Sequence, residues 1–328
     1  MRIVITMPVF EDWDAAALLC AMIDDVLAGA PDLAASILMI DDGSIHTVPP
    51  TGYRPQHLNA ISLLTLRRNV GHQRAIAIAL AYIQENLPCD AVVVMDADGE
   101  DRPEDILRLV DKFRSSRHPV AVFAERNRRL ESLKFKFFYQ CYRALHRLVT
   151  GSGISIGNFS LLPARHLKSV VTYSELWNHY AATVVNSKLE YVTIRADRGA
   201  RLHGESHMNF VALVIHGLSA LLTYHEVVSV RLLLASGFLA FIFCLLLVIV
   251  VFVRFGTSVM VPGWATLASG LLFLVVMQCL ATSVVMLFST MVNRSAPGFL
   301  PARDYSFFVS DYREIASNDS AAVRRAGA

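Results

Sequence analysis

An apolar run that ends in two aspartates is the feature of this sequence best suited to chemistry. The run Ala91–Met95 is followed by Asp96 and, two positions later, by Asp98. Side chains alternate along an extended chain, so residues two apart project to the same side. The two carboxylates can therefore hold one divalent cation, and hard oxygen ligands suit Mg²⁺ or Mn²⁺ bound together with the phosphates of a substrate. The substrate expected beside such an ion is a nucleotide diphosphate.

Short apolar runs alternate with helical patterns through the first part of the chain. This alternation predicts an α/β domain with a mostly parallel sheet that is covered by helices on both faces. In such sheets, ligands bind beyond the carboxyl ends of the strands. The expected strands are 3–7, 36–40, 61–66, 91–95 and 120–124, and the expected helices are 15–27, 71–84 and 103–113.

Polar clusters at the ends of the first four expected strands should converge on one edge of the sheet. They are Met7-Pro8, Asp41-Asp42-Gly43-Ser44, Arg67-Arg68-Asn69 and Asp96-Ala97-Asp98, in strand order. An acidic loop taken by itself is more often a solvated turn or a helix cap. The convergence of four clusters is what favours a binding site over that simpler interpretation.

Two long uncharged stretches predict a transmembrane hairpin. A helix over the 22 uncharged residues 232–253 would be about 33 Å long, enough to cross a hydrocarbon core of about 30 Å. The second uncharged stretch is 255–292, and its expected spanning part, 267–287, follows a connector that contains Pro262 and Gly263. The chain is 54% hydrophobic, above the usual share for a soluble protein, and the excess lies here. The alternative is a pair of buried helices in a soluble protein.

The arginines around these stretches predict the orientation of the hairpin. Arg231, Arg294 and Arg303 flank its outer ends, whereas Arg254 is the one charge in the connector. By the positive-inside tendency, both outer ends lie in the cytoplasm, and the first apolar strand is too brief for a signal peptide. We expect a multi-pass protein of the inner (cytoplasmic) membrane. Its expected parts are a cytoplasmic catalytic domain at 1–207, a juxtamembrane interfacial helix at 208–230, two transmembrane helices in 231–292 and a cytoplasmic tail at 293–328.

The remaining patterns concern partners. The segment Lys134–Val149 is amphipathic and basic, which fits either a helix lying on an anionic membrane surface or an ordinary helix packed on the sheet. The five scattered cysteines indicate a reducing compartment without structural zinc, and a net charge of +2 without a basic stripe argues against nucleic acid. The tail alternates like a strand at 304–309, which predicts pairing with a neighbouring subunit and a homo-oligomer.

Two groups of arginines are available to bind an anionic acceptor. They are Arg126, Arg128 and Arg129 after the last expected strand, and Arg195, Arg198 and Arg201 further along the chain. Guanidinium groups bind phosphate through paired hydrogen bonds. A phosphate monoester is largely dianionic at neutral pH, so as a nucleophile it needs cations more than a base. Attraction of anionic lipid is the simpler interpretation for any single arginine of this kind.

Six short motifs occur in a fixed order ahead of the two uncharged stretches. They are Pro8-Val9-Phe10-Glu11-Asp12, Asp41-Asp42-Gly43-Ser44, Arg68-Asn69-x-Gly71-His72, Asp96-Ala97-Asp98-Gly99-Glu100-Asp101-x-Pro103-Glu104, Arg126-x-x-Arg129, and Arg198-x-x-Arg201-x-x-Gly204-x-Ser206. In this order they resemble the family 2 glycosyltransferases, and within that family the polyprenyl-phosphate sugar transferases related to dolichol-phosphate mannose synthase. The resemblance runs from the first strand through Ser206 and into the two spans.

The resemblance implies a GT-A-type, Rossmann-like domain and a role for each matching position. Asp96 and Asp98 would be the catalytic pair and, with Glu100, would hold Mg²⁺ or Mn²⁺. The nucleotide-sugar would be bound by Pro8, Phe10, Glu11, Asp41 and Asp42, and the acceptor phosphate by Arg126, Arg129, Arg198, Arg201 and Ser206. Two departures stand out. Glu11 occurs where the family usually has Asn, and Asn158-Phe159-Ser160 occurs where it usually has Asp-Phe-Arg.

The implied activity is that of an inverting transferase that moves a sugar from a UDP- or GDP-sugar to a polyprenyl phosphate. Inversion follows from direct displacement by the acceptor, without a covalent intermediate. The first alternative is a processive polysaccharide synthase of the same fold, although the sequence has no Gln-x-x-Arg-Trp motif and only two expected spans. The second is a non-catalytic membrane scaffold that binds nucleotide-sugar or lipid, against which the intact Asp96-x-Asp98 pair argues.

Overall fold

The structure is a computed structural model of the chain, and it describes residues 1–46, 48–49, 52–126, 156–203, 224–256, 263–295 and 298–318. Its internal contacts divide the chain into two units. The first comprises 1–131, 154–223 and 299–328, and the second comprises 132–153 and 224–298. The predicted amphipathic segment at 134–149 and the greater part of the predicted interfacial helix at 208–230 lie outside the described residues.

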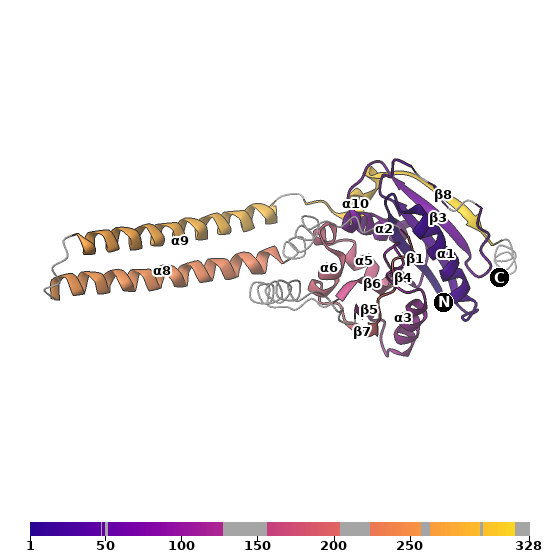
Figure 1. The fold of residues 1–328 in the computed structure, drawn as a ribbon, viewed down its shortest axis with the longest axis horizontal. Coiled ribbons are helices and arrows are strands. Elements are labelled where there is room, and N and C mark those ends of the chain that lie inside the picture. Colours follow the sequence, from indigo (N-terminus) through magenta and orange to yellow (C-terminus); the bar gives the residue numbers. More distant parts are fainter. Residues whose placement is uncertain are drawn as a thin grey trace. The chain divides into compact units, whose positions relative to one another are not determined.

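The first unit is built on an eight-stranded sheet with the strand order β7-β5-β6-β4-β1-β2-β3-β8 (Figure 1). Its centre is four parallel neighbours, β4 (Ala91–Val94), β1 (Arg2–Val9), β2 (Ala34–Asp41) and β3 (Ala60–Leu66). The mostly parallel sheet predicted from the sequence is confirmed. Toward one edge of the sheet lie β6 (Ile156–Pro163), antiparallel to β4 and β5, and then β5 (Ala121–Arg126), which pairs in parallel with β7 (Tyr191–Ala196).

Helices cover both faces of this sheet, as the alternation predicts. Helices α1 (Trp13–Leu27) and α3 (Glu104–Ser115) contribute to the hydrophobic cluster on one face. Helices α2 (His72–Asn86), α5 (Ala164–Val170) and α6 (Tyr180–Asn186) contribute to the cluster on the other. The carboxyl ends of the four central strands therefore meet at one edge of a rigid three-layer scaffold.

Strand β1 shows how the sequence pattern builds the two clusters. Ile3, Ile5 and Met7 are fully or almost fully buried in the cluster that contains α1 and α3. Val4, between them, belongs to the cluster that contains α2. A strand buried on both faces needs an uninterrupted apolar run rather than an alternating one, which is the pattern in residues 3–5.

A buried aspartate on α1 holds the chain that leads into β3. Asp24 is 1% exposed and accepts hydrogen bonds from the Tyr53 hydroxyl (2.7 Å) and from the backbone N–H groups of Gln56 (2.7 Å), His57 (2.8 Å) and Leu58 (2.6 Å). Desolvation alone would raise the pKa of Asp24, but these four bonds favour its ionised form and the net pKa lies below its ordinary value.

We expect Asp24→Asn to lower the free energy of unfolding by about 3 kcal/mol, because an amide offers one acceptor oxygen to four donors. A lowered native pKa stabilises the fold above the pKa of the unfolded state and stops doing so as pH falls through the native value. The gap between wild type and variant should be constant above pH of about 4 and shrink below it. Thermal melts across pH check this, with exposed Asp25→Asn as the control; equal melting of the two variants would contradict it.

The chain after the second apolar helix returns to the sheet of the first unit. Strand β8 (Val309–Ser317) pairs antiparallel with β3 at the edge of the sheet. The strand predicted at 304–309 is therefore wrong over most of its length, because α10 (Pro301–Asp304) and the 3-10 turn η2 (Tyr305–Phe307) occupy it.

Packing on α2 explains why residues 301–307 turn instead of extending. The Asp304 carboxylate accepts the Leu300 N–H at 3.0 Å and closes the turn. The Tyr305 ring then lies edge-on to Tyr82, with centroids 6.1 Å apart, and its hydroxyl donates to Glu85 at 2.8 Å. Pairing of the tail with a neighbouring subunit stays a prediction.

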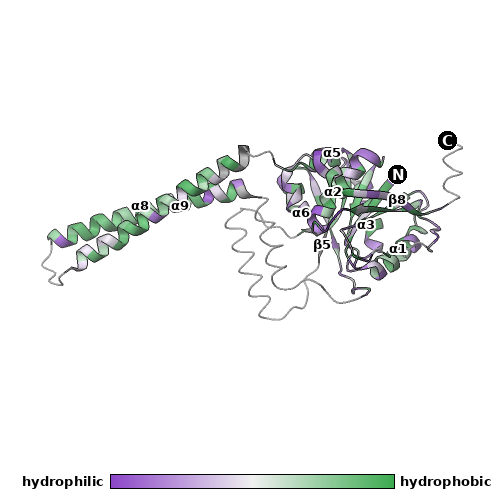
Figure 2. Cartoon of the chain, turned by 90° about the horizontal axis from the view of Figure 1, so that it is seen from above, coloured by the Kyte–Doolittle hydropathy of each residue, from purple (hydrophilic) through white to green (hydrophobic). Residues whose placement is uncertain are grey.

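The second unit contains the two apolar helices. Helices α8 (His225–Gly256) and α9 (Trp264–Ser295) pack against each other and are mostly hydrophobic along their length (Figure 2). Their stretches Glu226–Gly256 and Trp264–Ser289, of 31 and 26 residues, are long and apolar enough to cross a membrane. Large apolar side chains point outward, among them Phe252, 76% exposed, and Phe255, 87% exposed. The predicted fold, an α/β domain followed by an apolar two-helix hairpin, is confirmed.

Candidate active site

Hydrogen bonds join the loops that follow β1 and β2. The Glu11 N–H donates to Ser44 Oγ at 3.2 Å, and the Glu11 carboxylate accepts the N–H of Ile45. The Ser44 N–H donates to the Asp41 carboxylate at 2.9 Å. Glu11 has φ +54°, a backbone region that favours Asn and Gly over other residues. Two residues predicted to bind the nucleotide-sugar, Glu11 and Asp41, are thus brought together.

The next carboxylate, Asp42, fixes the start of α2. It is 3% exposed, and its two oxygens accept the N–H groups of Val70 (2.7 Å) and Gly71 (2.9 Å). Burial raises the pKa of Asp42, although these hydrogen bonds act in the opposite direction. Gly43 has φ +73°, and a Cβ there would lie 2.4 Å from the Asn69 nitrogen, so a glycine is needed at this contact. The second and third sequence motifs therefore meet in space.

The remaining predicted nucleotide ligands lie on or just after β1. Pro8 is buried within the strand, and Phe10, which follows it, is 45% exposed. An exposed aromatic ring beside the joined loops is suited to stack on a nucleobase.

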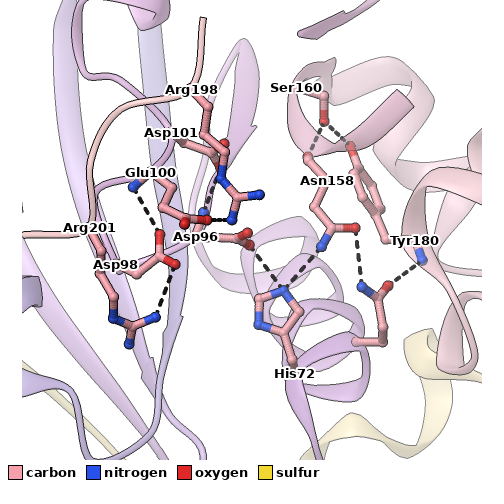
Figure 3. A network of polar contacts seen from close by, with 11 residues as sticks. His72, Asp96, Asp98, Glu100, Asp101, Asn158, Ser160, Tyr180, Arg198 and Arg201 are labelled. Atoms are coloured by element: carbon pink, nitrogen blue, oxygen red, sulfur yellow. Dashed lines mark hydrogen bonds and ion pairs between the residues drawn. The ribbon is translucent and has the colours of Figure 1, made fainter. Parts of the chain in front are cut away.

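The acidic loop after β4 is held by its own carboxylates (Figure 3). The Asp96 N–H donates to the Asp101 carboxylate at 3.0 Å, and the Glu100 N–H donates to the Asp98 carboxylate at 3.0 Å. Asp101 is 4% exposed and no site role was predicted for it. These bonds orient Asp96 and Asp98 at the carboxyl end of the strand, where the sequence predicted them.

The segment after β7 lies directly against this loop. The Gly199 N–H donates to the Glu100 carbonyl at 2.9 Å, and the Leu202 N–H donates to the Asp98 carbonyl at 3.0 Å. Gly99, with φ +80°, lies under Leu202, whose Cγ would be 2.3 Å from an added Cβ. Segments about 100 residues apart in the sequence thus form one surface.

Two of the predicted acceptor arginines are ion-paired with the acidic loop. Arg198 contacts the Glu100 carboxylate, and Arg201 Nη1 lies 3.4 Å from the Asp98 carboxylate (Figure 3). Arg201 also contacts Asp12, from the loop after β1. Of the other predicted acceptor residues, Arg126 is the last residue of β5 and its side chain is outside the described part of the structure, as are Arg129 and Ser206.

A polar network behind the acidic loop fixes His72, the first residue of α2. Its Nε2 lies 3.1 Å from the Asp96 carboxylate and 3.1 Å from Asn158 Nδ2. The backbone N–H of Tyr180 donates to the Gln73 side-chain oxygen at 2.7 Å, so Gln73 must present its amide nitrogen to Asn158 Oδ1, at 3.1 Å. The amide nitrogen of Asn158 therefore faces His72. One backbone donor thus orients the side-chain amides of both Gln73 and Asn158 (Figure 3).

Several carboxylates act on the imidazole of His72. Desolvation lowers the pKa of His72, but the carboxylates of Asp96, Asp42 and Asp101 outweigh it, and the net pKa lies above its ordinary value. Sequence reasoning gave His72 no role, although it ends the motif Arg68-Asn69-x-Gly71-His72. A signal was available in the sequence, because His72 begins a helix shortly after the polar cluster Arg67-Arg68-Asn69 at the end of a strand.

The donor set fits a divalent cation of the Mg²⁺ or Mn²⁺ type. Asp96 and Asp98 offer carboxylate oxygens, and such ions are commonly held by one or two carboxylates together with substrate phosphates and waters. Among the described residues, no group of three or more His, Cys, Asp or Glu side chains converges on one point as a complete metal cage. The predicted third ligand, Glu100, contacts Arg198 in the structure, and its role as a ligand stays a prediction. Asp96 and Asp98 would hold such an ion together with the phosphates of a substrate.

The chain is similar to known glycosyltransferases. Residues 4–165 match the family described as Glycosyl transferase family 2. The chain is 26% identical over 244 residues to the uncharacterized glycosyltransferase YkcC of Bacillus subtilis, covering 69% of this chain and 67% of that protein. It is 24% identical over 292 residues to the uncharacterized glycosyltransferase sll0501 of Synechocystis, covering 86% and 87%.

The fold is similar to that of a solved enzyme. Glucosyl-3-phosphoglycerate synthase from Mycobacterium tuberculosis, solved in complex with Mn²⁺, UDP-glucose and phosphoglyceric acid, gives a TM-score of 0.50 at 12% identity. The match covers 69% of this chain and 79% of that one. Residues 4–165 therefore match a glycosyl transferase family 2 domain, and the fold is of the GT-A type.

Proposed function

We propose that this chain is an inverting membrane glycosyltransferase that moves a sugar from a UDP- or GDP-sugar to a polyprenyl phosphate. The observation that carries the proposal is the meeting of the carboxylates after β4 with Arg198 and Arg201 after β7, at the edge where Glu11 and Asp41 also lie. One side of this surface suits a nucleoside diphosphate with its cation, and the other suits an anionic acceptor.

The reaction that fits is a single displacement. Asp96 and Asp98 would hold Mg²⁺ or Mn²⁺, which when bound acts as a Lewis acid on the departing diphosphate. An oxygen of the acceptor phosphate forms a bond to the anomeric carbon as the bond from that carbon to the nucleoside diphosphate breaks, which inverts the centre. The acceptor is already anionic, so the change of Asp to Asn at Asn158 is compatible with turnover.

The two arginines give the site its selectivity for an anionic acceptor. In the structure they neutralise Glu100 and Asp98. Binding of a cation by the acidic loop and binding of a phosphate by the arginines are therefore expected to strengthen each other, since each removes the other's counter-charge. The similar fold of glucosyl-3-phosphoglycerate synthase, solved with Mn²⁺, a nucleotide-sugar and a phosphate-bearing compound, supports this combination of ligands.

Membrane attachment supports a lipid acceptor. Along the chain, strand β7 precedes the two apolar helices and strand β8 follows them, and both strands belong to the same sheet. An even number of crossings returns the chain to its starting side, which two spanning helices satisfy. The arginines at the outer ends favour the cytoplasmic face of the inner membrane for the catalytic domain.

The test is to incubate the purified full chain in nanodiscs with Mn²⁺, radiolabelled UDP- or GDP-sugars and undecaprenyl phosphate. The proposal expects a lipid-linked monosaccharide that disappears when the cation is chelated. A polymer would indicate a polysaccharide synthase, and binding of nucleotide-sugar without any product would indicate a scaffold. Either result would replace the proposed function.

A further inference from the structure

Asp12 is a half-buried carboxylate that none of the assigned roles uses. It is the N-cap residue of α1, a position where aspartate usually accepts a hydrogen bond from the first turn of its helix. Its side chain makes no such cap hydrogen bond. It contacts the guanidinium of Arg201 instead, and the side chains of both residues are mostly buried, 16% and 21% exposed. The carboxylate therefore contacts a residue 189 positions away in the sequence and not the first turn of its own helix.

Each of the three guanidinium nitrogens of Arg201 has a different contact. Nε donates to the His203 carbonyl at 3.0 Å, and Nη2 donates to the Asp12 carboxylate. Nη1 faces the Asp98 carboxylate at 3.4 Å, longer than the usual 2.7–2.9 Å of a charge-assisted hydrogen bond. Two sides of the guanidinium are therefore held by the protein, and the third is directed at the acidic loop.

We propose that Asp12 is a positioning residue for the transfer: it holds Arg201 through Nη2 so that Nη1 is presented beside Asp98, where it binds an oxygen of the acceptor phosphate. The inference rests on the proposed function. An arginine has a long side chain with several rotatable bonds, and fixing it before the acceptor arrives removes that ordering cost from binding. Asp12 thus acts on the acceptor through Arg201 and not by contact with the acceptor.

The test measures binding of the acceptor and of the donor separately. Full-length wild type and Asp12→Asn in nanodiscs are titrated with undecaprenyl phosphate in the presence of Mn²⁺, and with the nucleotide-sugar in the absence of acceptor. We expect Asp12→Asn to weaken undecaprenyl phosphate binding, and to raise its KM, about tenfold. The donor Kd should be unchanged and kcat should change far less than KM. Asp14→Asn, an exposed carboxylate 3.9 Å from His203, is the matched control and should behave as wild type.

A double-mutant cycle separates positioning from a general loss of structure. Arg201→Ala should itself weaken acceptor binding, and adding Asp12→Asn to it should cause no further loss, because the residue that Asp12 acts through is gone. Additive losses would overturn the inference.

The other outcomes also decide between explanations. If Asp12→Asn bound the acceptor as wild type does, or if it weakened binding of the donor and not of the acceptor, the inference would be overturned. The proposed function would be unaffected by either result. If the wild type did not bind undecaprenyl phosphate, both this inference and the proposed function would be wrong.

Discussion

Asp98→Ala is expected to abolish sugar transfer while leaving the catalytic domain folded. A cation on the acidic loop stabilises the charge that develops on the departing diphosphate by several kcal/mol, and a loss of about 4 kcal/mol corresponds to a rate about 10³-fold lower. In the structure the Asp98 side chain accepts the Glu100 N–H and pairs with Arg201. Neither Glu100 nor Arg201 belongs to a hydrophobic cluster of the domain, so little of the hydrophobic core depends on these contacts.

The measurement combines three readouts on the purified full chain: turnover with the best donor, Mn²⁺ affinity by electron paramagnetic resonance, and thermal melting. Asp98→Asn keeps an acceptor for the Glu100 N–H but removes the charge, and it should lose activity and Mn²⁺ binding as Asp98→Ala does. Asp111→Asn, an exposed carboxylate on α3, should change none of the three. Turnover close to wild type in Asp98→Ala would remove this residue from the chemistry.

The first half of the domain was predictable because its signals are local. Each central strand is an apolar run with a polar cluster at its end, and the ends of the observed strands and helices lie within two residues of the predicted ones. Parallel strands buried on both faces carry this signal in their own sequence, whatever their neighbours are.

The later strands could not be predicted in the same way. Strand β6 contains Asn158 and Ser160, both buried, which an apolar pattern does not admit. The Ser160 hydroxyl donates its single hydrogen to the backbone carbonyl of Asn158 at 2.9 Å. The Tyr180 hydroxyl is therefore the donor in its 2.8 Å contact with Ser160. Partners of this kind come from distant helices, and no local pattern indicates them.

The sequence predicts a type of site but not its arrangement. The spacing of Asp96 and Asp98 indicated a cation, and the arginines indicated an anion. That Arg201 lies between Asp98 and Asp12 depends on the parallel pairing of β5 with β7 and on the close approach of Leu202 to Gly99. These contacts join segments about 100 residues apart, and the sequence carries no signal of their register.

Removal of β8 is expected to have the second large effect, on stability and on the site together. The strand pairs with β3 from Leu66 opposite Val309 to Ala60 opposite Ser317. Its Tyr312 ring stacks on Tyr82, with centroids 5.4 Å apart. A chain that ends at Phe308 would lose this ladder, at a cost of about 5 kcal/mol, and its melting temperature should fall by about 10 °C or more. It would also expose the edge of β3, which promotes aggregation.

The effect should reach the candidate active site through the end of β3. The Arg67 N–H donates to the Phe308 carbonyl at 2.8 Å, and Arg67 Nε donates to the Val309 carbonyl at 3.1 Å. Arg67 leads into the residues whose N–H groups Asp42 holds, and these precede His72. Loosening β3 should therefore weaken nucleotide-sugar binding even where the shortened chain remains folded.

A chain that ends at Asn318 is the matched control, because it keeps β8 whole. Hydrogen exchange followed by mass spectrometry should show β3 amides protected in this control and exchanging faster in the chain that ends at Phe308. The same comparison should show a weaker donor Kd in the shorter chain. Equal melting, exchange and donor binding in the two chains would mean that the returning tail contributes nothing to the catalytic sheet, and the link from the end of the hairpin to the site would have to be abandoned.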